Sequence, residues 1–239
     1  MEGAHVAGAA SCTVAGVDVR WVWATVLMVC LVLGLGGPRW LAARASARYP
    51  VPAADLAVAR RTLDALTVAP RGDAGTYDRA AFGTPWADDD RNGCDTRDDV
   101  LHRDLTAVVV DTDGCTVLSG TLDDPYTGTV IRFARGPGSA DVQIDHVVAL
   151  QDAWRTGASE WSARERLRIA NDPANLLAVD GGANQDKGAA DAAEWLPPSV
   201  GFRCAYVLRQ VRVKGAYGLS VTADEKRAMR RALDRCVTS

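Results

Sequence analysis

The stretch from Gln143 to Leu150 constrains the fold most, because an acid and an imidazole stand side by side in it. Strand residues alternate between faces, so Asp145 and His146 would point apart inside a regular strand. A strand that ends at this pair and passes into a helix over residues 147–155 lets both side chains lean toward one centre. The sequence therefore predicts a strand end that carries two chemical groups.

A polar segment further along the chain supplies partners for this pair. Residues 171–179 indicate a turn followed by a short buried strand, since Asp-Pro favours a turn and an apolar run follows it. Residues 180–183 are expected to form a second turn, and a helix is expected to start directly after them. One face of that helix is predicted to carry four polar residues, Asn184, Lys187, Asp191 and Glu194.

This arrangement resembles the ββα-metal motif of the HNH nucleases. It is most similar to the secreted actinobacterial HNH family, which is also classified as a domain of unknown function. Asp145-His146, Asn175 and Asn184 match the motif, with asparagine in place of its last histidine. The resemblance runs from about residue 77 to residue 236. It includes four further segments, Asn92–Arg97, Asp124–Gly128, Asn184–Gly188 and Trp195–Pro198.

The fold that the resemblance implies is α+β. A small antiparallel sheet or hairpin and the ββα-metal unit are expected to pack with several helices, stapled by disulfides, after an N-terminal apolar segment. The implied activity is that of a metal-dependent endonuclease that hydrolyses the phosphodiester bonds of nucleic acid, with DNA favoured over RNA. The chain is expected to be a monomer.

Phosphodiester hydrolysis needs an activated water, a cation that takes up charge on the phosphate, and help for the leaving oxygen. His146 is the expected general base, because imidazole titrates near neutrality. Asp145 and Asn184 are expected to hold one divalent ion through oxygen. Oxygen ligands and open water positions favour Mg²⁺, with Mn²⁺ as a substitute.

Three further residues have expected roles near this site. Asn175 is expected to act from behind the metal ligands, where it holds the loop opposite the Asp-His strand end. Lys187, one helical turn from Asn184, is expected to meet a phosphate oxygen. Arg97 is a candidate for contact with the substrate. His102 stands alone on a charged predicted helix and is assigned to the surface.

Each site residue also has a structural interpretation. His146 is compatible with a buried histidine beside an ordinary N-cap aspartate, and Asn175 and Asn184 with residues that serve turns. An exported binding or cell-surface module with an inactive HNH-like site therefore stays open as the alternative function. A secreted toxin with a neighbouring immunity protein is a third possibility. The sequence contains no identifiable base-reading element, so it does not decide between DNA and RNA.

The N-terminal part divides into three segments before a nuclease-like domain over residues 53–239. Residues 1–20 form a tail, residues 21–37 an apolar stretch without a charge, and residues 38–52 a linker. The apolar stretch is long for a signal-peptide core and short for a membrane span, so a cleaved signal and a membrane anchor both stay open. Arginines that follow it favour a cytoplasmic domain. The cysteines favour export, and we expect a secreted or cell-surface protein.

Four cysteines lie in the predicted domain, an even number that suits disulfides in an exported protein. They allow three pairings, of which the local one joins Cys94 to Cys115 and Cys204 to Cys236. Each bond would close a loop of some tens of residues and contribute roughly 3 kcal/mol through chain entropy. The sequence contains no C-x-x-C pair, which argues against a zinc site.

The other predicted elements come from periodicity and turn residues. Helices are expected over residues 52–68, 95–105, 162–171, 200–217 and 222–236. Strands are expected over residues 105–111, 115–120 and 129–135, the first two as a hairpin. Thr222 is a predicted N-cap with Glu225 as its capping-box partner.

Charge is unevenly distributed along the chain. The net charge of −3 argues against a protein that coats nucleic acid without specificity. Basic residues dominate from Ser199 onward, whereas acidic residues dominate over residues 86–125, with Asp88 to Asp90 as the densest run. The basic part is suited to guiding a polyanion, and equally to forming ordinary solvated helices.

Overall fold

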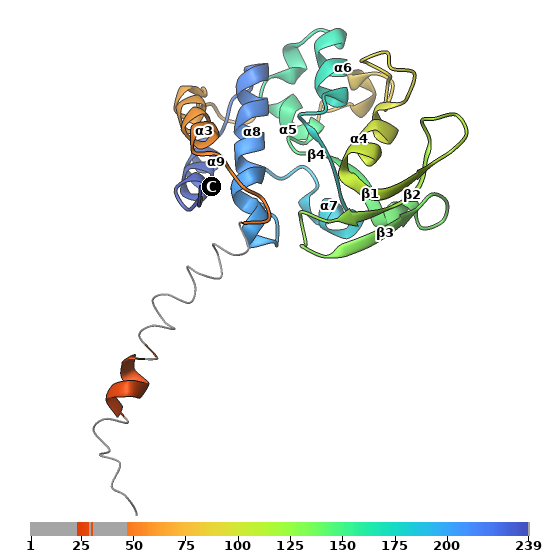
Figure 1. Cartoon of the computed structure of the whole chain (residues 1–239). Coiled ribbons are helices and arrows are strands. Elements are labelled where there is room, and N and C mark those ends of the chain that lie inside the picture. The colour runs from red at the N-terminus through yellow and green to blue at the C-terminus, as the bar shows by residue number, and fades with distance from the viewer. Residues whose placement is uncertain (1–22, 29, 31–46, 239) are drawn as a thin grey trace, which may run out of the picture. The chain divides into compact units, whose positions relative to one another are not determined.

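The computed structural model describes residues 23–28, 30 and 47–238 (Figure 1). The chain divides into two compact units, Met1–Ala42 and Ala43–Ser239. The first unit is helical over residues 23–28, and most of the predicted apolar stretch lies outside the described residues. Within the part of the chain that the structure describes, no helix has the length and apolar character that a membrane crossing requires.

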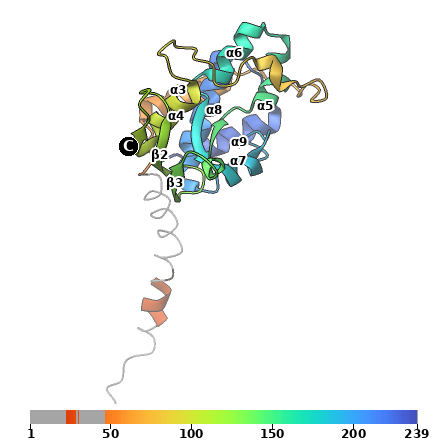
Figure 2. The same cartoon turned by 90° about the vertical axis from the view of Figure 1, so that its right-hand side faces the viewer.

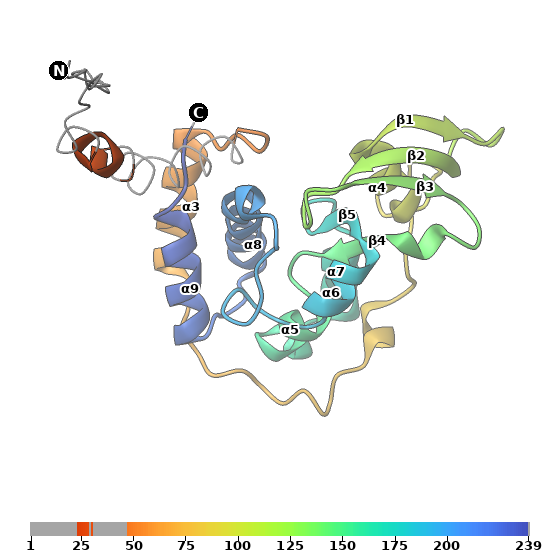
Figure 3. The same cartoon turned by 90° about the horizontal axis from the view of Figure 1, so that it is seen from below.

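The second unit combines helices with two small antiparallel sheets, which confirms the predicted α+β class. Its α-helices are α3 (Ala53–Ala65), α4 (Thr96–Asp104), α5 (Leu150–Arg155), α6 (Ala163–Asn171), α7 (Gly181–Lys187), α8 (Arg203–Tyr217) and α9 (Ala223–Leu233). Four short 3-10 helices connect them, η1 (Arg79–Phe82), η2 (Ser139–Asp141), η3 (Ala158–Glu160) and η4 (Val200–Phe202). Helices α3, α8 and α9 pack against one another at one end of this unit, away from the larger sheet (Figure 3).

The larger sheet has three strands in the order β1 (Leu105–Val110), β2 (Val117–Asp123) and β3 (Val130–Ala134). All neighbours pair antiparallel, and β1 and β2 form the predicted hairpin. Helix α4 packs against β1 and β2 (Figure 2) and shares a core with the sheet. That core includes Val100 and Leu101 of the helix. The helix predicted over residues 95–105 is therefore confirmed, and the structure adds that it covers this sheet.

The smaller sheet pairs β4 (Val142–His146) with β5 (Leu176–Asp180), and α7 follows β5 without a gap. In this register His146 lies opposite Leu176. Val142 and Ile144 join the core under α4, whereas the alternate residues Gln143 and Asp145 reach side chains of α7. Strand β4 therefore turns apolar side chains toward α4 and polar side chains toward α7, whereas Leu177 and Val179 of β5, which pair with those polar residues, are buried in a second apolar core.

Helix α7 starts at Gly181, three residues before the predicted start at Asn184, and this boundary prediction was wrong. Asp180 caps the helix, because its Oδ1 accepts a hydrogen bond from the Ala183 nitrogen at 2.7 Å. A side chain at Gly181 would not fit, since a Cβ there would lie 2.2 Å from the Ala140 oxygen. The helix ends at Lys187, so Asp191 and Glu194 do not continue the face that carries Asn184.

Helix α5 also departs from the prediction, because it starts at Leu150 and not at residue 147. The Val147 nitrogen donates to the Asn175 backbone oxygen at 2.7 Å, and the Val148 nitrogen donates to Asn175 Oδ1 at 2.8 Å. These bonds hold the chain extended after His146. The later start of α5 therefore results from a contact between segments far apart in the sequence.

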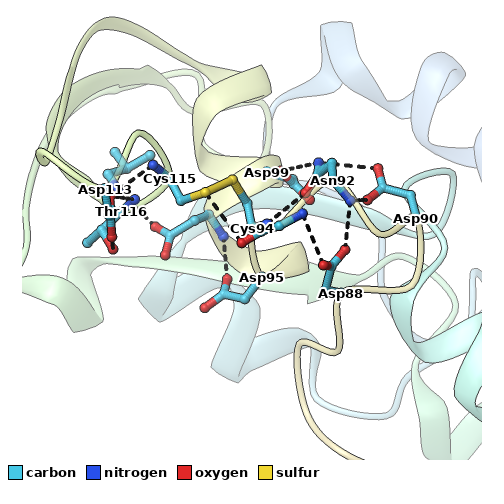
Figure 4. The surroundings of a disulfide bond; sticks show 12 residues. Asp88, Asp90, Asn92, Cys94, Asp95, Asp99, Asp113, Cys115 and Thr116 are labelled. Carbon is cyan, nitrogen blue, oxygen red and sulfur yellow. Dashed lines mark hydrogen bonds between the residues drawn. A yellow bond between two sulfur atoms is a disulfide. The ribbon is translucent and has the colours of Figure 1, made fainter.

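Both disulfides follow the local pairing, Cys94 with Cys115 and Cys204 with Cys236. The first joins the loop before α4 to the turn between β1 and β2 (Figure 4). The acidic run lies in the same loop, where the Asn92 nitrogen donates to carboxylates of Asp88 and Asp90 at 3.1 Å each. The second disulfide joins the start of α8 to the segment after α9.

The predicted capping box at α9 is half correct. Thr222 caps the helix, because its hydroxyl oxygen accepts a hydrogen bond from the Glu225 nitrogen at 3.0 Å. The Glu225 carboxylate, however, does not return to the cap. It is fully buried on the inner face of the helix, where it contacts Lys214 Nζ at 2.6 Å. The nearby cation therefore holds the carboxylate away from the cap.

Candidate active site

The carboxylate of Asp145 is held from two sides at the end of β4. Lys187 Nζ donates to its Oδ1 at 2.8 Å, and the Tyr126 hydroxyl donates to its Oδ2. The side chain is only 5% exposed. Burial raises the pKa of Asp145, and the positive charge of Lys187 opposes that rise. The two hydrogen bonds orient the carboxylate, and each oxygen retains a further lone pair.

His146 has one committed ring nitrogen and one free ring nitrogen. Its Nε2 lies 2.9 Å from the Ala170 carbonyl oxygen, which can only accept, so Nε2 carries the proton. The ring stacks on Trp86, with centroids 6.0 Å apart and an angle of 13° between planes. Burial lowers the pKa of His146 to about 4. At neutral pH the imidazole is therefore uncharged, with a lone pair on Nδ1. The expectation that this imidazole titrates near neutrality was wrong, because burial disfavours its charged form.

Asn175 is fully buried behind this strand end. Besides the bond from Val148 to its Oδ1, its Nδ2 donates to the oxygens of Val148 and Ile169 at 3.2 and 3.3 Å. All of these bonds go to backbone atoms. Asn175 therefore holds the backbone that follows His146 and does not itself face the site.

A polar cavity of about 350 Å³ brings the predicted chemical groups together. Asp145, His146 and Asn184 all line it, although they come from β4 and from α7. Asn184 Nδ2 donates to Gln143 Oε1 at 2.9 Å, which leaves the carboxamide oxygen for a ligand. Gln151 of α5 lies in the same wall. The cavity thus gathers a carboxylate, an imidazole and a carboxamide.

Lys187 does not line the polar cavity, so its position gives no support to the expected contact with a phosphate. The ammonium is fully buried and donates to Asp145 Oδ1 and to the His146 backbone oxygen at 2.8 Å each. Lys187 does follow Asn184 by one helical turn, but it points beneath the cavity toward β4. Its contacts orient the strand end from below.

Arg97 is also absent from the residues that line the cavity. Its guanidinium lies over the Phe133 ring, 5.8 Å from the centroid, on the three-stranded sheet. Burial lowers the pKa of Arg97. The proposed substrate contact therefore receives no support from its position. His102 is exposed on α4, as predicted.

Two residues at the site escaped the sequence reasoning. Tyr126 is fully buried and holds Asp145, and the only signal for it was its place in the segment Asp124–Gly128. Arg79 lies in η1, is exposed, and lines the polar cavity. Nothing in the local sequence pointed to Arg79, because its position depends on the packing of η1 against α5 and α6.

Asp145 and Asn184 bring oxygen atoms to this cavity, which are the ligands that a hard divalent ion takes. Within residues 23–28, 30 and 47–238, no three Asp, Glu, His or Cys side chains are grouped as metal ligands. An ion would therefore depend on the oxygens of Asp145 and Asn184 and on water. Mg²⁺ accepts such an arrangement, because it keeps several waters and needs only one or two carboxylates together with substrate phosphate.

The fold and the cavity define a class of small α+β domain, in which two antiparallel strands and the helix after the second strand present polar groups to one site. The chain belongs to the family of GmrSD restriction endonucleases, C-terminal domain, whose sequence pattern matches residues 95–232. This range is more than half of the chain and contains Asp145, His146 and Asn184. The family is nuclease-related.

One relative extends the comparison beyond the family domain. An "Uncharacterized secreted protein" of Arthroderma benhamiae is 39% identical over 180 residues, which cover 74% of this chain and 84% of that protein. No solved structure matches the chain.

Proposed function

We propose that this protein is a metal-dependent endonuclease of the HNH type that hydrolyses phosphodiester bonds of nucleic acid, with DNA favoured over RNA. The observation that carries the proposal is the meeting of Asp145, His146 and Asn184 at one polar cavity. The antiparallel strands β4 and β5, with α7 directly after β5, present them in the order of a ββα-metal motif. Membership in a nuclease-related family supports the same conclusion.

In this mechanism His146 accepts a proton from the attacking water at Nδ1, since Nε2 is committed to Ala170. Asp145 and Asn184 hold one Mg²⁺, for which Mn²⁺ substitutes. When bound, the ion supplies positive charge at the phosphate and at the leaving oxygen. Arg79, exposed at the rim of the cavity, binds a non-bridging phosphate oxygen.

Lys187 and Asn175 act as positioning residues in this proposal. Lys187 holds Asp145 and the His146 backbone in one orientation through two bonds of 2.8 Å. Asn175 holds the backbone after His146. Neither reaches the reacting atoms. Their fixed contacts keep the acid, the base and the amide in place before the substrate arrives.

We also propose that the protein acts outside the cytoplasm. Two disulfides persist in oxidising compartments and are rare in reducing ones. The relative from Arthroderma benhamiae carries the word "secreted" in its name.

The decisive experiment is plasmid cleavage by the full chain with Mg²⁺, with EDTA as the metal-free arm. His146→Ala is expected to reduce the rate by about 10²–10⁴-fold, the usual contribution of a general base. His102→Ala serves as the matched control, because His102 is an exposed histidine away from the cavity, and it should cleave like the wild type. Circular dichroism checks that both variants fold.

The contrary result is equally clear. If wild type and His146→Ala are equally inert with Mg²⁺, Mn²⁺ and Zn²⁺ on plasmid, linear duplex, single-stranded DNA and RNA, the protein is a binding module with an inactive site.

A further inference from the structure

Helix α8 carries a carboxamide on its buried, mostly apolar face. Val207 and Val211 of this face belong to an apolar core, and Gln210 stands between them in the sequence with only 1% of its surface exposed. Val147, which follows β4 in the chain, is buried in the same core. The helix therefore brings a polar group to the backbone that comes directly after His146.

The amide nitrogen of Gln210 has two partners. Its Nε2 donates to the Val147 oxygen and to the Tyr206 hydroxyl oxygen, at 3.0 Å each. A backbone carbonyl can only accept, so the nitrogen of the carboxamide must face Val147. The buried Oε1 of Gln210 has no hydrogen-bond partner among the described residues. An unpaired buried acceptor costs stability, so stability alone does not account for a glutamine at this position.

Two peptide units follow His146, and the first of them is held at both ends. Lys187 Nζ donates to the His146 oxygen at 2.8 Å. At the other end, the Val147 nitrogen donates to the Asn175 backbone oxygen at 2.7 Å. A peptide unit is planar and turns as a rigid body between its two Cα atoms. A hydrogen bond at each end therefore stops this rotation.

The second peptide unit is held in the same way, and Gln210 supplies one of its two bonds. The Val148 nitrogen donates to Asn175 Oδ1 at 2.8 Å, and the Val147 oxygen accepts from Gln210. Without Gln210 this unit keeps only the bond at its nitrogen, and its buried oxygen has lost its donor. Rotation of the unit then changes the direction in which the chain leaves His146.

We propose that Gln210 is a further positioning residue of the site, which fixes the second peptide unit after His146 and thereby the direction of the imidazole. Its expected effect on catalysis rests on the proposed nuclease function. Gln210 does not line the polar cavity, so it acts only through the backbone. Helix α8 thus supports the strand end from one side, whereas α7 supports it through Lys187.

The test compares two variants that each lose a buried hydrogen bond of Gln210. Gln210→Met keeps the length of the side chain and removes both bonds. Tyr206→Phe keeps the ring and removes only the bond to the hydroxyl, so the bond to Val147 stays. Both variants are expected to unfold at lower urea concentration than the wild type, because each loses a buried hydrogen bond. Urea denaturation of both therefore shows how much of any change in cleavage is a change in stability.

Steady-state plasmid cleavage by the full chain with Mg²⁺ separates positioning from stability. Gln210→Met should lower kcat per folded molecule by about 10–100-fold with KM little changed, because a misplaced base weakens the transition state more than substrate binding. Tyr206→Phe should cleave like the wild type. Equal kcat for Gln210→Met and wild type, or equal losses in the two variants, would overturn the positioning role while the nuclease function stands.

Amide hydrogen exchange, followed by NMR, covers the case in which the wild type cleaves nothing. That result overturns the proposed function, and the exchange rate of the Val148 amide then tests the hold on the backbone alone. Relative to the slowest amides of the core, this amide should exchange about tenfold faster in Gln210→Met, the weight of one hydrogen bond. In Tyr206→Phe the relative rate should match that of the wild type. Equal relative rates in all three proteins would overturn the inference.

Discussion

Two buried lysines serve different regions of this molecule, and their comparison separates the site from the scaffold. Lys187 lies beneath the polar cavity and pairs with one carboxylate, Asp145, at 2.8 Å. Lys214 lies in the interior between two carboxylates, Asp152 at 2.8 Å and Glu225 at 2.6 Å. The side chains of both lysines are fully buried.

The cluster around Lys214 ties helices together. Lys214 belongs to α8, Asp152 to α5 and Glu225 to α9. Arg71 extends the cluster, because it pairs with Asp191 and contacts Glu194 at 2.8 Å. None of these residues lines the polar cavity. This cluster of Lys214, Arg71, Asp152, Glu225, Asp191 and Glu194 links the helices through ion pairs away from the polar cavity, and we call it the staple.

The difference lies in the ratio of charges and in access. At the site one ammonium, that of Lys187, orients one carboxylate, that of Asp145. Asp145 lines a cavity that a cation or a phosphate can enter. In the staple, four carboxylates share two cations, so negative charge is in excess. Burial, together with the charges of Asp152 and Asp191, raises the pKa of Glu225 to about 7, and Lys214 opposes this rise. A buried lysine alone therefore does not mark an active site, whereas access to its carboxylate partner does.

The largest expected effect is on the staple. Lys214→Met leaves two buried carboxylates without their cation, and removing one partner of a buried pair costs about 3–5 kcal/mol in the free energy of unfolding. Urea denaturation measures the loss, and cleavage per folded molecule should stay near that of the wild type. Arg227→Met, which removes an exposed ion pair, is the control and should cost under about 1 kcal/mol. Lost cleavage with unchanged stability would break the comparison.

Lys187→Met should affect both properties. We expect a loss of about 3 kcal/mol in stability, because Asp145 stays buried without its cation. We also expect cleavage per folded molecule to fall by about 10–100-fold, the usual effect of removing a residue that orients a metal ligand. Steady-state cleavage at several Mg²⁺ concentrations measures this, with a weaker apparent Mg²⁺ affinity expected. Unchanged cleavage would make Lys187 a second staple.

The smallest expected effect is a pH dependence of stability that comes from the excess of carboxylates in the staple. The pKa of Glu225 rises from 4.5 to about 7 on folding, so between these values the folded protein holds a proton that the unfolded chain has released. Stability contributed by this proton is present at low pH and is lost as pH rises toward 7 and above. From pH 5 to pH 8 the wild type should lose on the order of 2 kcal/mol more than Glu225→Gln.

Urea denaturation of both proteins at the two pH values gives this difference directly. Glu160→Gln changes an exposed glutamate and should keep the wild-type pH slope. Equal slopes for Glu225→Gln and wild type would show that Lys214 and Arg71 compensate the surrounding carboxylates fully.

Much of the framework was predictable from the sequence because its causes are local. The Asp145-His146 pair predicted a strand that ends there, and β4 does end at His146. The Thr112-Asp113-Gly114 turn predicted the β1–β2 hairpin, and cysteine spacing indicated the observed disulfides. Asp145, His146 and Asn184 could be selected together because a strand end and a following helix carry them at recognisable positions.

Other features depended on contacts between distant segments. Helix α5 starts later than predicted because Asn175 binds the backbone after His146, and no residue near Val147 indicates this contact. The side chain of Lys187 points toward β4 for a similar reason. The sequence shows that Lys187 shares a helical face with Asn184, but it does not show which strand packs against that face.

What the sequence determined by itself was the order of the elements and the chemical groups at the end of β4, because periodicity and turn residues act over a few positions. Only the tertiary structure decided which of those groups face a cavity and which are held beneath it. It also brought Arg79 to His146, in a cavity whose walls come from segments far apart in the chain. Packing between such segments depends on the whole fold, so no local pattern records it.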